Sequence, residues 1–304
     1  MHRATPPFAA WTKPVAAPAG GLKDKTFAAV GGNIKCISDA GGKINMLNNA
    51  VAQNKAAWEH RAYEWRVSHV GTPQVVANEM MNNPKKSLRY HAEYFNDVDG
   101  KNIASICGSD GRRAIALSLL GAKAVVFDIS EPQKKYALEL AKAAGVNIGY
   151  IIGDFCETDT IGYAEYFDYA YAEGGILHYF HDLDRFFSIL FKIMKTSSTL
   201  ILCDFHPFGK IASANWNADS KDRATEADVD YFDTNIKSGD VAFKQFFDER
   251  EHDSFPDVSV RRYTLSDIIN AIIRAGFNLV EFNEHPGWVN QKRPGEFTIV
   301  AKKV

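Results

Sequence analysis

The sequence has little excess charge of either sign, few cysteines and no long apolar run, and each absence excludes a class of protein. Its 35 basic against 37 acidic residues leave no surplus for binding nucleic acid or an anionic membrane. Cys36, Cys107, Cys156 and Cys203 lie far apart without a CxxC pair, so zinc clusters and disulfide frameworks are not expected. No apolar stretch approaches the roughly 18 residues that span a bilayer. We therefore expect a cytoplasmic protein.

Composition divides the chain into unequal parts. Of the first 45 residues, 19 are Ala, Gly or Pro, and Lys13 and Pro14 interrupt any apolar region of a secretory signal. About sixty residues after Cys203 lack the regular alternation of the rest, which is far more than the usual loop of about 2 to 6 residues. We expect a tail or leader, a helical N-terminal cover and a main domain with an inserted cover segment, over residues 1–45, 46–98, 99–304 and about 207–262, respectively.

Hydrophobic patterning predicts the fold. Helical spacing before residue 95 is followed by short apolar strands that alternate with amphipathic helices. Crossover helices join parallel strands, so we expect an α/β, Rossmann-like doubly wound, mostly parallel seven-stranded sheet. No helix separates the last two strands, so the last one should be antiparallel. The strands are expected at residues 101–107, 124–127, 146–152, 167–172, 199–203, 277–282 and 297–301.

Small and polar residues follow five of these strands. In an open parallel sheet, ligands bind at the carboxyl ends of the strands, so these positions are the candidate site. Asp128 lies twenty residues beyond Gly108, a spacing at which a carboxylate can accept both hydroxyls of a ribose. The five segments are Cys107–Arg112, Asp128, Gly153–Phe155, Glu173–Gly175 and Asp204–His206.

Taken in order, these segments resemble the class I S-adenosylmethionine-dependent methyltransferases of the small-molecule type. The resemblance covers about residues 100 to 303 and includes the closing helix, strand, turn and strand. It implies that S-adenosylmethionine is the cofactor. In that family the first glycine turn lies under the methionine part, the acid after the second strand holds the ribose, and the turn after the third contacts adenine.

Carried over by resemblance, these roles fall on a defined set of residues. Tyr63, in the helices before the sheet, is the candidate for the methionine carboxylate. The other cofactor-binding candidates are Gly108, Ser109, Gly111, Asp128, Ile129, Asp154, Phe155 and Glu173. Asp154 has the alternative reading of a turn cap, because Asp after Gly is common in turns.

The first motif departs from the family pattern of acid, apolar residue, Gly, any, Gly, any, Gly. The corresponding run is Ser105-Ile-Cys-Gly-Ser-Asp-Gly111, so only the last glycine keeps its register. Cys and Ser are small enough to let a ligand approach the backbone. Ser105, however, cannot replace the carboxylate that often anchors this turn.

Two histidines are candidates for a general base. His178 follows the fourth strand, and His206 follows the fifth. An unperturbed histidine pKa of about 6.5 allows proton uptake near neutral pH. Both histidines could instead be structural. Together with Asp204 they lack recognised metal-ligand spacing, so no metal site is expected.

The expected reaction is methyl transfer to a small-molecule acceptor by in-line displacement. A macromolecular acceptor is disfavoured because the Asn/Asp-Pro-Pro-Tyr type of motif is absent after the fourth strand. The stretch from Asp219 to Asp257 also holds twelve acidic and five basic residues, which would repel phosphate. A non-catalytic protein that binds S-adenosylmethionine or S-adenosylhomocysteine remains an alternative, as does a nicotinamide-dependent dehydrogenase. The sequence leaves the acceptor and the oligomeric state open.

Overall fold

The computed structural model describes residues 39–208, 230–288 and 290–304, of which 40–304 fall in one compact unit. The expected tail lies outside the described residues up to residue 38, and residues 39–45 belong to the first helix. Residues 209–229 of the expected insertion also lie outside the description. The helices are α1 (Asp39–Glu59), α2 (Ala62–Trp65), η1 (Arg66–Val70), α3 (Pro73–Asn82), η2 (Pro84–Tyr94), α4 (Arg112–Leu119), α5 (Glu131–Ala143), η3 (Ile161–Tyr163), η4 (Leu177–Tyr179), α6 (Leu183–Ile193), η6 (Lys244–Phe246), η7 (Glu249–Ser254) and α8 (Leu265–Arg274).

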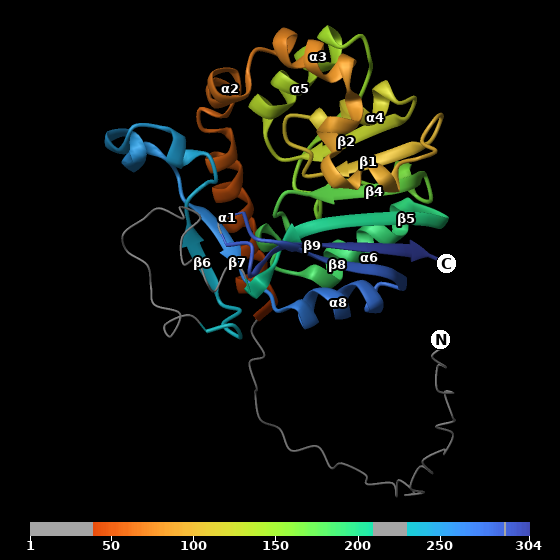
Figure 1. The fold of residues 1–304 in the computed structure, drawn as a ribbon. Coiled ribbons are helices and arrows are strands. Elements are labelled where there is room, and N and C mark those ends of the chain that lie inside the picture. The colour runs from red at the N-terminus through yellow and green to blue at the C-terminus, as the bar shows by residue number, and fades with distance from the viewer. Residues whose placement is uncertain (1–38, 209–229, 289) are drawn as a thin grey trace, which may run out of the picture. The chain divides into compact units, whose positions relative to one another are not determined.

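The strands form one large sheet and one small one. The seven-stranded sheet has the order β3-β2-β1-β4-β5-β9-β8, and β6 pairs with β7 in a separate sheet (Figure 1). The contacts among β1 to β5 are parallel, whereas β9 is antiparallel to both β5 and β8. The predicted mostly parallel sheet with an antiparallel last strand is confirmed. The strands are β1 (Asn102–Ile106), β2 (Lys123–Asp128), β3 (Gly149–Ile152), β4 (Phe167–Glu173), β5 (Met194–Phe205), β6 (Ile236–Gly239), β7 (Val258–Arg261), β8 (Phe277–Pro286) and β9 (Pro294–Lys303).

Local sequence signals explain where the crossover helices begin. At the start of α5 the Ser130 hydroxyl accepts a hydrogen bond from the Gln133 backbone N–H. At the start of α8, Thr264 and Asp267 cap each other in a complete capping box. Each bond satisfies a donor that the first helical turn would otherwise leave unpaired.

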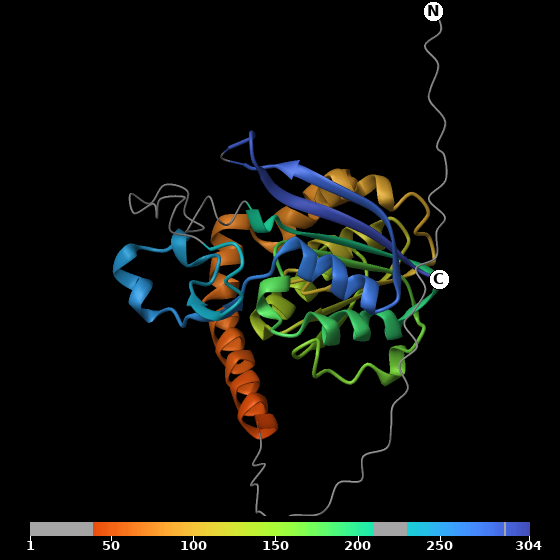
Figure 2. The same ribbon diagram turned by 90° about the horizontal axis from the view of Figure 1, so that it is seen from below.

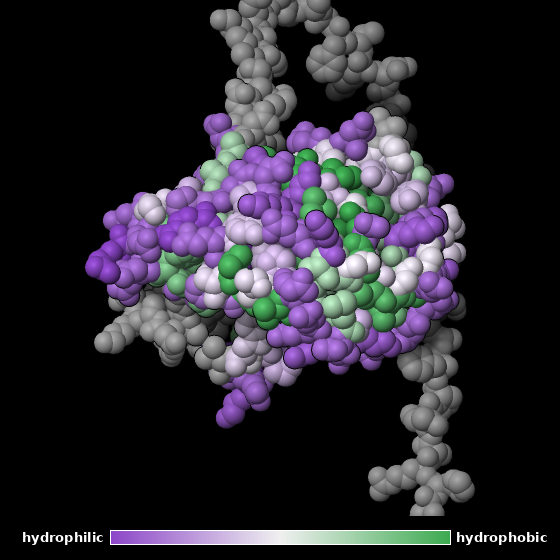
Figure 3. All heavy atoms as spheres, turned by 90° about the horizontal axis from the view of Figure 1, so that it is seen from above, coloured by the Kyte–Doolittle hydropathy of each residue, from purple (hydrophilic) through white to green (hydrophobic). Residues whose placement is uncertain are grey.

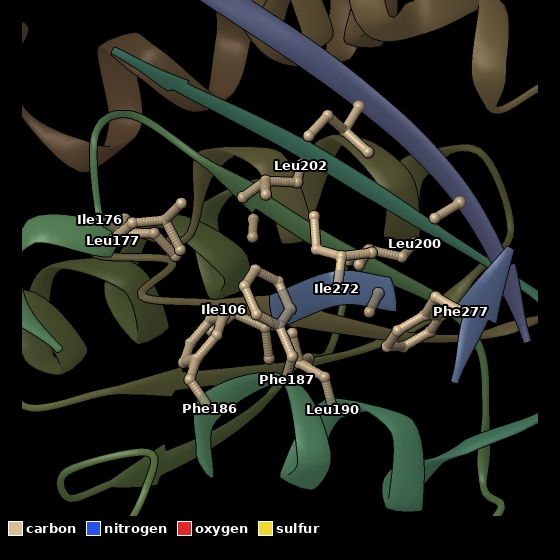
Figure 4. Close-up of a cluster of buried hydrophobic side chains, with 14 of the residues drawn as sticks. Ile106, Ile176, Leu177, Phe186, Phe187, Leu190, Leu200, Leu202, Ile272 and Phe277 are labelled. Carbon is tan, nitrogen blue, oxygen red and sulfur yellow. The ribbon is translucent and has the colours of Figure 1, made fainter. Parts of the chain in front are cut away.

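Helices cover both faces of the large sheet, and neighbouring strand residues feed the two hydrophobic layers alternately. Leu200 and Leu202 of β5 pack with α6 and α8, as Figure 4 shows. Ile201, between them, packs in the other layer with residues of α3, α4 and α5. Figure 2 shows the sheet edge-on between these layers. This alternation follows from the two-residue period of a strand.

The long helix α1 crosses the sheet edge at which the parallel strands end (Figure 1). Asn54 of α1 exchanges two hydrogen bonds with the backbone of Ser259 in β7, at 2.6 and 3.1 Å. Lys55 donates to the backbone oxygen of Ile129, just after β2, at 2.9 Å. The helix is thus tied both to the insertion and to the ligand edge of the sheet. Within the described ranges, no helix combines the length and apolarity needed to cross a membrane.

Candidate functional site

A cavity of about 230 Å³ opens where β1, β2, β3 and β4 end. Its walls come from the turns after these strands, from η1 and from the inner face of α1. Among the candidates from the sequence, it brings together Gly108, Ser109, Asp128, Ile129, Asp154, Phe155 and Glu173. Tyr63, Gly111, His178 and His206 do not line it. These four are located below.

The turn after β1 keeps an unusual backbone. Cys107, Ser109 and Gly111 have φ angles of 50°, 49° and 71°, in the left-handed region that favours glycine. These are the three positions at which the family pattern has glycine. A left-handed L-residue costs roughly 1–2 kcal/mol, so the turn stores strain at Cys107 and Ser109. Gly111 is the N-cap of α4, and a Cβ built on it would lie 2.9 Å from the Cβ of Ala137.

Asp128 helps to hold this strained turn. One carboxylate oxygen accepts from the Ser109 N–H at 2.9 Å, and the other accepts from the Ser130 N–H at 3.0 Å. Tyr150 of β3 adds a hydrogen bond from its hydroxyl to the Ser109 carbonyl oxygen, at 2.6 Å. Burial raises the pKa of Asp128 despite these backbone donors. Asp128 therefore joins the turn after β1 to the end of β2 while it lines the cavity.

The turn after β3 supplies one polar and one aromatic residue. The Oδ1 atom of Asp154 accepts from the backbone N–H groups of Cys156 and Glu157, at 2.7 and 3.2 Å. Burial raises the pKa of this carboxyl group. Phe155 is buried edge-on against Phe127 and also reaches the cavity. Asp154 thus is a turn cap whose side chain also faces the candidate site.

Glu173 ends β4 in a cluster of charges. Arg113 grips its carboxylate with two hydrogen bonds of 2.8 Å, and Arg89 lies 3.3 Å from it. Burial alone would raise the pKa of Glu173, but the guanidinium groups outweigh burial and lower it. A carboxylate held in this way stays ionised within a buried wall.

Arg66 of η1 is the main cavity residue that the sequence did not single out. Its buried guanidinium donates to Gln133 at 2.9 Å and to the Ser109 hydroxyl at 2.7 Å, and it lies 2.9 Å from Asp110. Asp110 also pairs with Arg112, at 2.8 Å. Burial alone would raise the pKa of Asp110, but the two arginines outweigh it and lower that pKa to about 2. Asp110 thus pairs with both Arg66 and Arg112, so these three side chains together carry one net positive charge.

Tyr63 lies one helical turn before Arg66 but faces elsewhere. Its hydroxyl donates to Glu139 of α5, and its ring packs edge-on against Tyr136.

The sequence did contain a signal for Arg66. Arg66 falls four residues after Ala62, on the apolar side of the helical pattern, where a charged residue usually indicates a buried ion pair.

The candidate bases lie beyond the end of β4. His178 belongs to η4, and it lines a second, smaller cavity of about 40 Å³ with Asp204, Phe205 and Arg262 among others. Its neighbours Leu177 and Tyr179 line the small and the large cavity, respectively, so η4 forms the wall between them.

His206 lies in neither cavity. It is buried, its Nδ1 accepts from the Phe208 N–H at 3.1 Å, and its Nε2 lies 2.9 Å from a carboxylate oxygen of Glu284. Burial lowers the pKa of His206, although Glu284 opposes the change. The ring therefore connects the end of β5 to β8. Among the described residues, no group of three or more His, Cys, Asp or Glu side chains is placed to hold a metal ion.

Aromatic side chains of the insertion pack against α1. Phe243 is buried between Trp58 and Trp65, with ring centroids 5.7 and 5.4 Å away. Trp58 also meets Tyr179 of η4 edge-on, at 5.8 Å. The described part of the insertion is therefore packed against the elements that wall the large cavity.

Known proteins share this fold. Residues 106–202 match a family model described as a methyltransferase domain. A search of the curated proteins found no match. Three similar solved structures are described as S-adenosylmethionine-dependent methyltransferases, the first of them as a putative one. The Listeria monocytogenes structure is 17% identical, covers 72% of this chain and 98% of its own, and has a TM-score of 0.55.

The other two are equally distant in sequence. The Mesorhizobium loti structure is 18% identical, with 73% of this chain and 99% of that chain covered and a TM-score of 0.50. For the Clostridium acetobutylicum structure the identity is 12%, the coverages are 72% and 89%, and the TM-score is 0.50. The domain and the fold point to S-adenosylmethionine as the cofactor, as predicted. Residues 106–202 of this chain thus match a methyltransferase domain, and the chain has the fold of solved S-adenosylmethionine-dependent methyltransferases.

Proposed function

We propose that this protein transfers a methyl group from S-adenosylmethionine to a small-molecule acceptor. The observation that carries the proposal is the large cavity, which gathers Asp128, Asp154 and Glu173 from the carboxyl ends of β2, β3 and β4, on both sides of β1. When bound, S-adenosylmethionine supplies a methyl group activated by its sulfonium. The protein then has chiefly to align the acceptor with that methyl group and exclude water.

The residues around the cavity fit the cofactor chemically. Gly174 lines the cavity with φ +101°, and a Cβ built there would meet nothing within 4 Å, so backbone alone forms that part of the wall. We assign the ribose to Asp128, whose carboxylate can accept hydroxyl hydrogen bonds. Asp154 and Phe155 are assigned to the adenine, with Ile129 beside them. Glu173 is assigned to the methionine end.

The turn after β1 and Arg66 complete this assignment. Gly108 and Ser109 would lie under the methionine part, and Gly111 would support their turn from outside the cavity. We assign the methionine carboxylate to Arg66 in place of Tyr63. The surplus positive charge of the Arg66, Asp110 and Arg112 group suits a carboxylate, and Arg66 reaches the cavity whereas Tyr63 does not.

The acceptor is proposed to enter between η4 and the cover segment. His178 is the candidate base there, and His206 is the reserve. The acidic insertion would repel phosphate, which favours a small molecule over a nucleic acid. For the domains, we propose a tail or leader at residues 1–45, a helical cover at 46–98 and a main domain at 99–304, with the inserted cover segment at about 207–262.

We also propose a cytoplasmic location, which the free thiols of Cys107, Cys156 and Cys203 support.

The test is calorimetric titration with S-adenosylmethionine, S-adenosylhomocysteine and NAD. Wild-type protein should bind the first two and not NAD. Asp128→Ala should weaken binding by about 1.5 to 3 kcal/mol, or roughly ten- to a hundred-fold, because it removes charge-assisted hydrogen bonds. Mass spectrometry of candidate acceptors should then detect the mass gain of one methylation.

Asp168→Ala is the matched control. This carboxylate lies at the start of β4, at the end of the strands opposite the cavity. It accepts from the Asn102 N–H at 2.8 Å and pairs with Lys195 at 2.9 Å. Its loss should lower stability without changing cofactor affinity. An unchanged dissociation constant in folded Asp128→Ala would refute the ribose assignment.

A non-catalytic protein on the same fold is the second candidate. The replacement of two motif glycines by Cys107 and Ser109 is the observation that favours it. The two functions differ in one measurement. A catalyst converts S-adenosylmethionine into S-adenosylhomocysteine when its acceptor is present, whereas a binding protein holds either molecule without turnover.

A further inference from the structure

Arg89 has a backbone conformation that needs an explanation. Its φ and ψ angles are 54° and −138°, inside the otherwise helical segment η2. Glycine adopts this region readily, whereas other residues do so only where surrounding contacts hold them. The contacts of the Arg89 side chain should therefore show which interactions hold its backbone in this strained conformation.

The Arg89 guanidinium lies between two buried carboxylates. It is 3.3 Å from Glu173 at the end of β4 and 3.1 Å from Glu296 at the start of β9. Glu296 also accepts from the Tyr90 hydroxyl at 3.1 Å. Since β5 separates β4 from β9 in the sheet, Arg89 connects the cavity wall to the β8–β9 hairpin across an intervening strand.

Counting hydrogen bonds at Glu173 leaves one position open. Arg113 donates to each carboxylate oxygen, and Arg89 donates to Oε1. A carboxylate offers about four acceptor positions, so three are taken by guanidinium groups. The fourth belongs to Oε2, and Glu173 lines the large cavity. A donor bound in the cavity could use that position.

We propose that Arg89 is a positioning residue of the cofactor site. By donating to Oε1 of Glu173 together with Arg113, it keeps the carboxylate ionised and its free Oε2 position available to the cationic amino group of the methionine part. This inference rests on the proposed function and names a residue that acts through Glu173. Its strained backbone is what places the guanidinium between β4 and β9.

The arrangement has a consequence for pH dependence. Burial raises the pKa of Glu173, while Arg113 and Arg89 lower it, with a smaller effect of His91 in the same direction. The other titratable groups near this carboxylate are Tyr171, Cys203 and Glu296. Removal of Arg89 should therefore move the pKa of Glu173 upward. A protonated Glu173 attracts a cation less, so ligand affinity should fall as the pH is lowered.

The experiment is calorimetric titration of S-adenosylhomocysteine, which carries the same amino group, from about pH 5.5 to 8.5. The ratio of variant to wild-type dissociation constants cancels the ligand's own titration. For Arg89→Gln we expect a ratio of about three at pH 8 that widens as the pH is lowered to 5.5, since one charge-assisted hydrogen bond is lost at every pH and Glu173 takes up a proton more readily without Arg89. Arg89→Lys should restore most of the affinity and the wild-type profile.

Two further variants separate the guanidinium from the backbone and the hairpin. Arg89→Gly suits the left-handed backbone but lacks the charge, so it should fold and still show the widening ratio; it carries the test if Arg89→Gln does not fold. Tyr90→Phe removes the hydroxyl contacts to Glu296 and Cys203 but keeps the guanidinium, and its ratio should stay constant with pH. A pH-independent ratio for Arg89→Gly would overturn the proposal. Failure of the wild type to bind at any pH would instead overturn the proposed function.

Discussion

In the described part of the chain, three of the six non-glycine residues with positive φ lie at the large cavity or beside it. Cys107 and Ser109 line the cavity, and the Ser109 hydroxyl accepts from Arg66. Arg89 donates to Glu173, which also lines it. Each such conformation costs of order 1–3 kcal/mol and persists only where the surroundings enforce it. The strain is therefore part of how the site is shaped.

The paired glycines after β4 allow a direct test at the residue scale. A Cβ on Gly175 would lie 1.6 Å from the Phe205 ring, whereas one on Gly174 would meet nothing within 4 Å. Both glycines have positive φ. We expect Gly174→Ala to lower the free energy of unfolding by about 1–2 kcal/mol. Gly175→Ala should cost roughly 2–5 kcal/mol, because overpacking adds to the strain.

Urea unfolding of the two variants, followed by circular dichroism, measures this difference. Gly174→Ala also serves as the control for the loss of glycine itself. Equal losses of stability in the two variants would show that Phe205 moves aside at little cost.

At the scale of elements, η4 is placed by one buried carboxylate. Asp204 of β5 accepts from the backbone N–H groups of Ile176 and Leu177, both at 2.8 Å, and from that of Phe205. These bonds anchor the start of η4 to the end of β5. His178 follows directly and is thus presented at the small cavity.

If His178 is the base, His178→Ala should lower turnover by at least about a hundred-fold and leave cofactor affinity nearly unchanged. Turnover and S-adenosylhomocysteine binding, measured on the same preparation, check this expectation. His181→Ala is the matched control, because His181 lies 3.5 Å from the Ser259 hydroxyl of β7 and lines neither cavity. Near-normal turnover in His178→Ala would make His178 structural. A flat pH-rate profile from about pH 6 to 9 would indicate an acceptor that needs no base.

The elements of the sheet were largely predictable, whereas the residues between them were less so. Apolar runs and alternating helices reveal β1 to β5 because each depends on a local period. Arg66 was missed since its partners Ser109, Asp110 and Gln133 lie 43 to 67 residues away. The Arg89 conformation was equally hidden, because it is imposed by Glu173 and Glu296 rather than by its neighbours in sequence. The departure from the family's glycine pattern was misleading in one respect. Cys107 and Ser109 keep the left-handed backbone that glycines adopt at these two positions.

At the scale of the whole molecule, the surface mixes polarity. Figure 3 shows hydrophobic side chains scattered among hydrophilic ones on the face seen from above. Exposed hydrophobic residues include Val75 and Met81 of α3 and Leu138 of α5. Single exposed apolar residues of this kind are normal in folded proteins.

His91 connects three parts of the molecule and should make its stability depend on pH. The ring is fully buried, with Nδ1 2.7 Å from the Tyr171 hydroxyl of β4 and Nε2 3.0 Å from the Thr298 hydroxyl of β9. Burial lowers the pKa of His91 to about 4. Between that value and the unfolded pKa of about 6.5, the unfolded chain binds the extra proton. The contribution of neutral His91 to the free energy of unfolding is therefore complete above about pH 6.5 and declines as the pH falls toward 4.

We expect this histidine to account for roughly 2 to 3 kcal/mol of lost stability between about pH 6.5 and 4. Urea unfolding of wild type and His91→Gln at several pH values isolates its share, because the other titrating groups are common to both proteins. The variant should lose that much less stability over the interval. Parallel pH dependences would show that His91 takes up its proton without penalty in the folded state.

The position of β9 bears on the order in which the chain acquires its structure. Strand β9 lies between β5 and β8, so among the described strands β8 pairs with β9 alone in the large sheet. During synthesis β8 emerges first and must wait for the next strand before it can be incorporated. The edge of β5 stays uncovered for the same interval, and an uncovered strand edge invites pairing with other chains. A released chain truncated before Pro294 should thus be the form most in need of a chaperone.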